Sequence, residues 1–241
     1  MSEKSTSVLE QYDFQLIRSI RGRGAILCET DKGLMLLREY SGSVLRLMIE
    51  DEVLNGLKKV GGSVDWYVKN QAGQVLSIDS DGTKYVLKSW FDAKECDVRN
   101  ITEILAAVRA LAELHLSLQS VSEGLSMETK KGLERFRALS LKNTMEKHQR
   151  ELKKARTFMR AKQKKNEFEI QTLQSFEEFY EQGETSLRLL SSSCYNELKE
   201  QADREIQLCH GNYNQHNILI GAKRVSIVNF ERLSVDLQLT D

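Results

Sequence analysis

The first forty residues alternate between hydrophobic and polar positions in short runs. Three such runs lie between residues 14 and 40, and turn-forming residues at 21–24 and 31–33 separate them. A two-residue periodicity bounded by glycine and aspartate is typical of β-strands. We therefore expect a three-stranded antiparallel meander in residues 14–40.

The hydrophobic spacing changes to that of a helix in residues 43–60. Strand-like runs then return at 64–68, 73–78 and 84–91. Residues 1–91 are thus expected to form a sheet-rich lobe of five or six antiparallel strands with one helix packed on it. The helix is indicated by apolar residues three and four apart and by a terminal glycine pair: Leu47, Val53, Leu54, Leu57, Gly61 and Gly62.

Helical spacing dominates the rest of the chain. Hydrophobic residues recur three and four apart in residues 101–115, and residues 129–192 read as helix interrupted chiefly near Gly183. Strand character returns only at 217–228, where two short apolar runs flank a turn. The expected fold class is therefore α+β, with a mostly helical second lobe in residues 92–241.

The charges of the long helical region are segregated. Residues 130–165 hold fourteen basic and three acidic residues, a net charge of +11, whereas residues 166–205 hold three basic and ten acidic residues, a net charge of −7. We expect two helices packed antiparallel, with both the apolar stripes and the opposite charges paired. The alternative is a basic helix that binds nucleic acid or a membrane. We favour the hairpin because a phosphate-binding surface should not be neutralised by its own chain.

Overall composition narrows the class of protein. The chain has 241 residues, and its 35 basic and 35 acidic side chains cancel, so no global field attracts nucleic acid. Its four cysteines lie far apart and form no Cys-x-x-Cys pair, which argues against zinc and for reduced intracellular thiols. No run of about 18 apolar residues occurs, and from the polar, charged residues at the N-terminus we expect no signal peptide. We expect a cytoplasmic protein that does not insert into a membrane.

The candidate chemistry lies in residues 209–219 and 227–231. The first stretch contains His210 followed by Asn212, and Asn217 lies five residues further on. Phosphoryl transfer needs a carboxylate to orient or deprotonate a hydroxyl, an amide oxygen for one Mg²⁺ and a second carboxylate for the other. A loop and an adjoining hairpin bring such groups close together.

These residues resemble the catalytic loop and hairpin of the aminoglycoside phosphotransferase and choline kinase group. In that group the loop reads His-Gly-Asp-x-x-x-x-Asn and the hairpin ends Ile-Asp-Phe/Trp-Glu/Asp. The resemblance implies a protein kinase-like two-lobed fold, with the C-terminal part of the second lobe missing from this sequence. It also implies that His210 structures the loop and that Asn217 is a metal ligand. Asn212 stands in place of the base aspartate and Asn229 in place of the metal-binding aspartate.

The same resemblance assigns residues of the first lobe to a nucleotide. Arg38 falls where the group has its phosphate-binding lysine, and Glu50 falls at the glutamate that partners it. The turn of Gly22 and Gly24 would cover the nucleotide, and Trp90 lies in the hinge between the lobes. The residues alone leave open that Arg38 is an exposed strand residue, that Glu50 lies on a solvated helix face and that the glycines form an ordinary turn.

Other residues near the motif have simpler interpretations. His216 is close to the expected metal site, but no second ligand lies at metal spacing, so we expect it to be exposed. Cys209 is expected to be a small core residue rather than a nucleophile. A missing carboxylate could come from Glu231 or Asp236, but only with an altered hairpin geometry.

Two aspartates are therefore replaced by asparagine in one site, and an arginine stands for the lysine. We expect a catalytically degenerate protein, with ATP and Mg²⁺ bound weakly if at all. The chain is most similar to the CotS-type spore coat branch of the group, which implies a coat component or an assembly scaffold. Its partners would be other coat proteins, and it would be made in the mother-cell cytoplasm and deposited in the spore coat. The alternative is an ATP-dependent small-molecule phosphotransferase.

Overall fold

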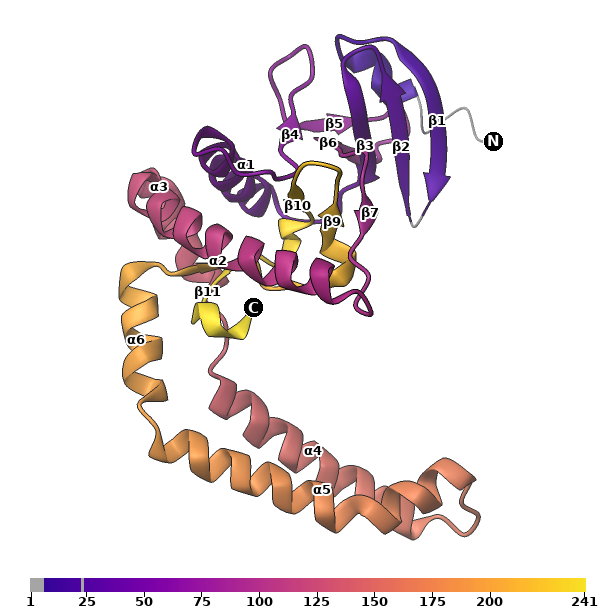
Figure 1. Ribbon diagram of the computed structural model, residues 1–241. Coiled ribbons are helices and arrows are strands. Elements are labelled where there is room, and N and C mark those ends of the chain that lie inside the picture. The colour runs from indigo at the N-terminus through magenta and orange to yellow at the C-terminus, as the bar shows by residue number, and fades with distance from the viewer. Residues whose placement is uncertain (1–6, 23) are drawn as a thin grey trace. The chain divides into compact units, whose positions relative to one another are not determined.

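The computed structural model describes residues 7–22 and 24–241 (Figure 1). The chain divides into two compact units. One comprises Met1–Phe136 together with Ile206–Asp241, and the other comprises Arg137–Glu205. The expected boundary between lobes at residues 91 and 92 does not coincide with a boundary of these units, and it stays a prediction.

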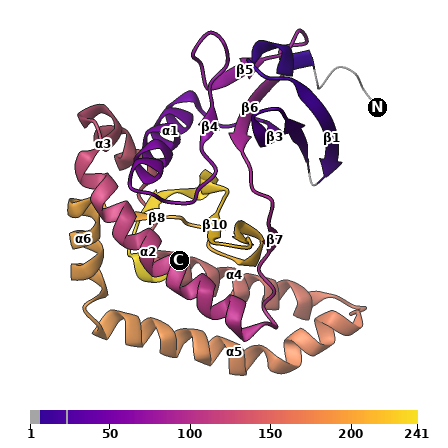
Figure 2. The ribbon, with the colours of Figure 1, turned by 45° about the horizontal axis from the view of Figure 1, so that its top comes forward.

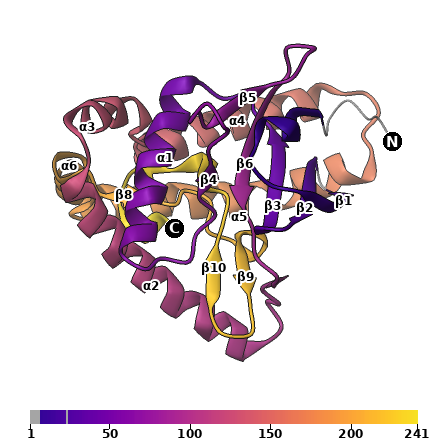
Figure 3. The same ribbon diagram turned by 90° about the horizontal axis from the view of Figure 1, so that it is seen from above.

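The N-terminal part of the first unit is a six-stranded antiparallel sheet, as the alternating pattern predicts. Strands β1, β2 and β3 form the expected meander, β6 pairs with β3, and both β4 and β5 pair with β6. Figure 3 shows β6, β3, β2 and β1 side by side in that order. The strands are β1 (Leu16–Gly22), β2 (Ala25–Thr30), β3 (Gly33–Glu39), β4 (Tyr67–Val68), β5 (Leu76–Ile78) and β6 (Lys84–Ser89).

The one helix of this part, α1 (Val44–Lys59), is also confirmed. It begins because the Ser43 side chain accepts a hydrogen bond from the amide of Arg46. It ends at Lys59, and two residues later Gly61 continues the chain in a left-handed conformation with a φ of +88°. The amide of Gly62 then donates to the carbonyl of Leu57 at 2.8 Å. This is a glycine stop of the Schellman type, as the glycine pair predicts.

The sheet has two differently packed faces. Leu37 and Leu87 belong to a small core shared with the N-terminal turn, whereas Val86 belongs to the main core with α1. Because side chains alternate along a strand, Arg38 and Lys88 lie on the same face as Val86. Two charged residues of the sheet therefore face the main core side.

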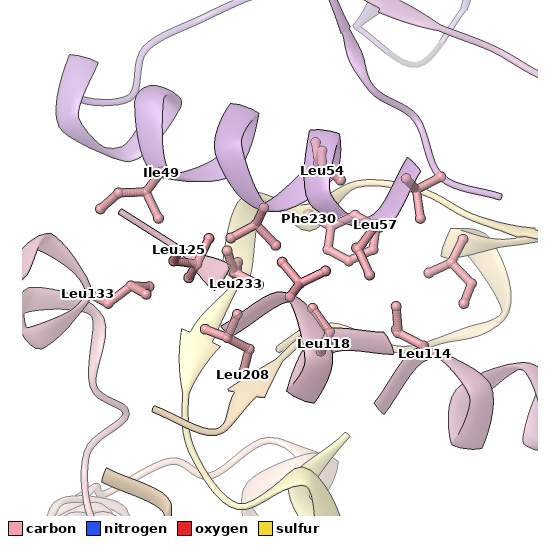
Figure 4. Packing of buried hydrophobic residues seen from close by; sticks show 14 of the residues in the cluster. Ile49, Leu54, Leu57, Leu114, Leu118, Leu125, Leu133, Leu208, Phe230 and Leu233 are labelled. Atoms are coloured by element: carbon pink, nitrogen blue, oxygen red, sulfur yellow. The ribbon is translucent and has the colours of Figure 1, made fainter. Parts of the chain in front are cut away.

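The main core is built between α1 and α2 (Ile101–Gly124), with α3 (Met127–Leu133) beside them. Figure 4 shows Leu208, Phe230 and Leu233 inserted between these helices. Figure 2 shows the yellow C-terminal segment running between α1 and α2. The segment that follows the candidate motif is thus held by the core on both sides.

The helix that the spacing of residues 101–115 predicts is confirmed as α2, but only part of its apolar stripe is buried. Leu114 and Leu118 are buried, while Ile101, Leu105 and Val108 are each more than half exposed. A wide apolar stripe therefore predicts the helix but does not say which part of the stripe is covered.

Three short ladders complete the first unit. Strands β9 (Ile218–Ile220) and β10 (Val225–Ile227) form the expected hairpin, and β7 (Lys94–Glu95) adds to β9. Strand β8 (Leu208–Cys209) pairs with β11 (Ser234–Val235). The buried strand that the sequence predicts at Cys209 is confirmed as β8. The sequence did not indicate β7 or β11, which are too short to show a periodicity of their own.

The second unit contains the expected helical hairpin. Helices α4 (Leu141–Ala161) and α5 (Glu167–Ser192) pack against each other, followed by α6 (Tyr195–Glu205). Arg156 of α4 forms an ion pair with Glu177 of α5, so the basic helix lies beside the acidic one. This confirms the pairing of the two charge blocks.

The expected interruption near Gly183 is wrong. Helix α5 continues through Gly183, and the helical region breaks instead at residues 134–140 and 162–166. A Cβ at Gly183 would lie 2.4 Å from Nε2 of Gln149, so this glycine makes room for a side chain of α4. The break before α5 is instead set by Asn166, which forms a capping box with Glu169.

Within the described ranges, no helix is both long enough and apolar enough to cross a membrane.

Candidate functional site

The loop that begins at His210 is organised by the imidazole of that residue. His210 is fully buried, and its Nε2 lies 3.0 Å from the carbonyl oxygen of Val228. Its Nδ1 accepts a hydrogen bond from the amide of Asn212 at 3.2 Å. These two contacts place the ring proton on Nε2. Burial lowers the pKa of His210, so the ring is neutral at physiological pH and holds the loop rather than moving protons.

A second anchor of the loop comes from Asp241. Its buried carboxylate accepts hydrogen bonds from the amides of His210 and Gly211, at 2.8 and 2.6 Å, and lies 3.1 Å from Nε2 of His115. Burial alone would raise the pKa of Asp241, but these hydrogen bonds hold it below its ordinary value. Gly211 has a φ of +76°, and a Cβ there would lie 2.1 Å from the carbonyl oxygen of Arg232. Only glycine fits at this point of the loop.

The structure brings together the three asparagines that the motif singles out. Nδ2 of Asn217 donates to the carbonyl oxygen of Asn212 at 2.9 Å, and Nδ2 of Asn229 donates to Oδ1 of Asn217 at 2.8 Å. Oδ1 of Asn212 accepts from Asn214 at 3.0 Å. Asn229 has a φ of +66°, a conformation that asparagine adopts more readily than most residues. The amides of the site therefore bond to one another.

This set of donors does not fit a divalent metal ion. Mg²⁺ prefers carboxylate oxygens, but the residues at the expected ligand positions, Asn217 and Asn229, are neutral amides. Oδ1 of Asn217 already accepts a hydrogen bond from Asn229. In the part of the chain that the structure describes, no group of three or more histidine, cysteine, aspartate or glutamate residues could hold a metal.

Arg38, on β3, reaches across to the segment that follows Asn229. Its Nη1 lies 2.5 Å from Oε1 of Glu231, and both side chains are partly exposed. Arg46 of α1 also contacts this segment, since its Nη2 donates to the carbonyl oxygens of Glu231 and Leu233. Glu231, the carboxylate considered as a substitute metal ligand, is thus engaged by Arg38.

Glu50 is brought near the site but not to Arg38. The carboxylate of Glu50 is buried. It accepts one hydrogen bond from the hydroxyl of Tyr67 at 2.6 Å and another from Nε of Arg46 at 3.1 Å. Burial raises the pKa of Glu50, although these hydrogen bonds oppose the rise. Glu50 is therefore not on a solvated helix face, the alternative that the residues alone left open. Glu50, which the resemblance pairs with Arg38 of β3, instead forms an ion pair with Arg46 of its own helix.

Sequence reasoning missed a buried ion pair beside the site. Nζ of Lys88, on β6, lies 2.8 Å from Oδ2 of Asp65, and both side chains are almost fully buried. The same oxygen accepts a hydrogen bond from the amide of Asn229 at 3.1 Å. The ammonium also lies 4.6 Å from the ring centroid of Tyr67. The available signal was that Lys88 lies on the same face of its strand as the apolar Val86, although nothing in the sequence named its partner.

The remaining nucleotide-site candidates are peripheral to these contacts. Gly24 has a φ of +75° in the turn between β1 and β2, and nothing lies within 4 Å of a Cβ added at Gly22. The amide of Trp90 donates to the carbonyl oxygen of Leu34 at 2.9 Å, which ties the segment after β6 to β3. Neither the glycines nor Trp90 is joined to the asparagines by a described hydrogen bond.

His216 and Cys209 occupy the environments expected for them. His216 is exposed, and its Nδ1 lies 2.6 Å from Oε2 of Glu95. Cys209 is buried on β8, its thiol lies 3.3 Å from the carbonyl oxygen of Asp236, and burial raises its pKa. The side chain of Asp236 accepts from the amide of Leu237, so it serves a local turn.

Comparison with known proteins finds similarity only in structure. No family model and no curated protein sequence matches the chain. An aminoglycoside phosphotransferase from Alicyclobacillus acidocaldarius is similar with a TM-score of 0.80 and 14% identity, covering 98% of this chain and 68% of that chain. An AMP-bound spectinomycin phosphotransferase has a TM-score of 0.65 and 12% identity, with coverages of 98% and 71%.

A third similar structure is an amicoumacin kinase in complex with AMP-PNP and Ca²⁺. Its TM-score is 0.57 at 12% identity, and the match covers 99% of this chain and 66% of that chain. At such identities structural similarity establishes a fold and not an activity. The chain therefore has the α+β kinase-like fold of the aminoglycoside phosphotransferases.

Proposed function

We propose that this chain is a catalytically degenerate kinase-like protein that acts by binding other molecules rather than by transferring phosphate. The observation that carries the proposal is the chain of hydrogen bonds from Asn229 to the Asn217 side chain and from Asn217 to the backbone carbonyl of Asn212. The side-chain oxygens of Asn217 and Asn212, at the positions where a kinase holds a metal ion and its base, already accept hydrogen bonds from Asn229 and Asn214.

The chemical cost of the replacements is large. General-base assistance is typically worth about 10²–10⁴ in rate, and Asn212 cannot accept a proton as an aspartate does. Asn229 supplies a neutral group where a carboxylate would balance the charge of a metal ion and of phosphate. The carboxylate nearest in sequence, Glu231, is paired with Arg38. The other carboxylate that contacts Asn229, Asp65, accepts a hydrogen bond from the backbone amide of Asn229 and is paired with Lys88.

The same contacts suit a protein that keeps one conformation without a ligand. Arg38 and Arg46 join β3 and α1 to the segment at Glu231. The ion pair of Lys88 and Asp65 joins β6 to the amide of Asn229. The sheet is thereby tied to the catalytic-loop region by side chains of the chain itself, as a scaffold requires.

A more specific role as a spore coat component, or as a scaffold for coat assembly, is part of the proposal. It is supported by the resemblance to the CotS-type branch, which residues 85–92, residues 111–115 and the long charged helices carry together with the motif at 209–231. Its partners would be other coat proteins, and it would reach the coat from the mother-cell cytoplasm. Fluorescent tagging in a sporulating host tests this role. Signal at the forespore is the expected result, and a diffuse signal with none at the forespore would contradict it.

The second candidate is an ATP-dependent small-molecule phosphotransferase. It is favoured by one observation, namely that similar structures contain AMP and AMP-PNP. For this activity Glu231 would have to leave Arg38 and face the metal site.

Thermal unfolding of the purified protein separates the two candidates. Because a ligand stabilises the state that binds it, saturating Mg²⁺ and ATP at 100 times the Kd would add about 2.7 kcal/mol. We expect no shift of the melting temperature with ATP, with Mg²⁺ or with both. A shift that requires both would favour the phosphotransferase.

A further inference from the structure

We infer that the first unit has a second binding site, for an apolar molecule that carries one cationic group, in a hollow beside α1. This site is separate from the loop at His210 and does not depend on the function proposed above. The hollow has a volume of about 840 Å³ and is lined by one face of α1, by residues 74–78 and by the C-terminal end of α2. Small-molecule sites in proteins typically occupy about 300–1,000 Å³.

The rim of this hollow is unusually apolar for a surface. Val44 and Met48 of α1, Val60 directly after α1 and Ile78 of β5 all line it, and each is more than half exposed. Four large apolar side chains in one exposed cluster form a patch of the kind that marks a binding site rather than scattered surface residues. The apolar part of a ligand would be covered by these side chains.

The charges in the hollow favour a cation. Its lining contains two carboxylates, Asp51 and Glu52, against one cation, Lys59. Glu52 is committed to Ser126 and Thr129, whose hydroxyls donate to its Oε2. Asp51 is therefore the carboxylate available to a ligand.

Asp51 is poorly neutralised by its own neighbours. Its side chain is 15% exposed, and its ion-pair partner, Lys69, is 55% exposed with Nζ 3.9 Å from Oδ2. Nδ2 of Asn55 donates to Oδ1 at 2.8 Å. Burial raises the pKa of Asp51, although Lys69 and Asn55 oppose the rise. A ligand amine would bring a second cation to this carboxylate, closer than the exposed ammonium of Lys69.

Three matched ligands test the inference: 4-(1-naphthyl)butylamine and the alcohol and carboxylic acid with the same apolar body. Binding to the full chain would be measured from the naphthyl fluorescence. We expect the amine to bind about fivefold more tightly than the alcohol, the upper end for a partly exposed ion pair, and the acid to bind more weakly than both. Equal binding of all three, or no binding of any, would overturn the inference.

Two variants locate the site. Asp51→Asn keeps an acceptor for Asn55 and should remove the preference for the amine, so that amine and alcohol bind alike. Ser120→Trp, at an exposed position of α2 that lines the hollow, should block all three ligands. Glu123→Gln, on the same helix but outside the lining, is the matched control and should change nothing. If Asp51→Asn left the preference intact while the protein remained folded, the assignment of the site to this hollow would be wrong.

Discussion

Asparagine differs from aspartate in a way that accounts for the geometry at His210 to Asn229. An asparagine side chain carries both a donor and an acceptor, so Asn229 can donate to Asn217 while Asn217 donates to the carbonyl of Asn212. Carboxylates at the same positions would only accept, and they would repel each other unless a cation lay between them. The replacements at Asn212 and Asn229 thus allow this site to be stable without a metal.

The substitution Asn229→Asp should destabilise the protein. The new carboxylate cannot donate to Asn217, and it would lie near the buried carboxylate of Asp65, which bonds to the amide of residue 229. We expect a loss of about 1–3 kcal/mol in the free energy of unfolding in urea at pH 7, the usual cost of an unsatisfied buried group. Asn143→Asp, at an exposed position of α4, is the control and should cost little. An unchanged stability for Asn229→Asp would show that the amide pairing contributes nothing.

The burial of His210 predicts a dependence of stability on pH. Its folded pKa lies below the unfolded value of about 6.5, so the unfolded chain takes up a proton that the folded chain does not. Stability is therefore complete above about pH 6.5 and decreases as the pH falls below it, by up to about 1.4 kcal/mol per unit. Urea unfolding at several pH values should show that His210→Gln reduces this slope. The exposed His148→Gln should not, and equal slopes in all three proteins would refute the assignment.

Among the elements, the pairing of α4 with α5 has the most specific register. Gln149 is buried between the helices, where its Nε2 donates to the carbonyl of Tyr180 at 3.0 Å and lies 3.3 Å from Glu184. Gly183 leaves the space that this side chain occupies. A polar residue buried at a helix interface requires its partners in place, and this fixes the register. The apparent helix breaker is thus a packing feature of the hairpin.

The effect of Gly183→Ala on stability should reverse when Gln149 is replaced, and this reversal tests the packing. In the natural sequence, Gly183→Ala should destabilise the hairpin, because its Cβ displaces the Gln149 amide from its partners. In a Gln149→Ala background the same substitution should stabilise by up to about 1 kcal/mol, the difference in helix propensity between alanine and glycine. Thermal unfolding followed by circular dichroism measures both effects. If Gly183→Ala stabilises both backgrounds equally, Gln149 does not require the glycine.

In the first unit taken as a whole, the sheet is joined to the segment at Asn229 through the ion pair of Lys88 and Asp65. Asp65 is fully buried, and its Oδ1 has no hydrogen-bond partner among residues 7–22 and 24–241. The pair is therefore sensitive to the loss of its cation. Removing one partner of a buried ion pair is much more damaging than replacing both.

Lys88→Met should accordingly cost about 3–5 kcal/mol in the free energy of unfolding, because it leaves the Asp65 charge uncompensated. The double variant Lys88→Met with Asp65→Leu should recover a large part of that loss. Arg18→Met, which breaks an exposed ion pair with Glu29, is the control and should cost less than about 1 kcal/mol. Urea unfolding compares the variants. A Lys88→Met protein as stable as the control would contradict a structural role for the pair.

How much the sequence predicts depends on how local the signal is. Helix α1, the meander and the α4–α5 hairpin follow from periodicity, caps and charge blocks, each of which is read from a continuous stretch of the chain. The loop at His210 follows from spacing within one short stretch. The pair of Lys88 and Asp65 could not be predicted, because these residues are 23 positions apart and meet only when β6 packs beside the segment before β4. The same holds for the pairing of Arg38 with Glu231, 193 positions away.

Phosphoryl transfer from ATP is the measurement that tests the central claim most directly. Purified protein would be incubated with γ-labelled ATP and Mg²⁺, with and without small hydroxyl and amine acceptors, and followed for phosphate release and acceptor labelling. Because Asn212 and Asn229 replace both carboxylates and are bonded to their neighbours, we expect no turnover above the background without protein. A turnover near 1 per second, the low end for kinases, would contradict the account.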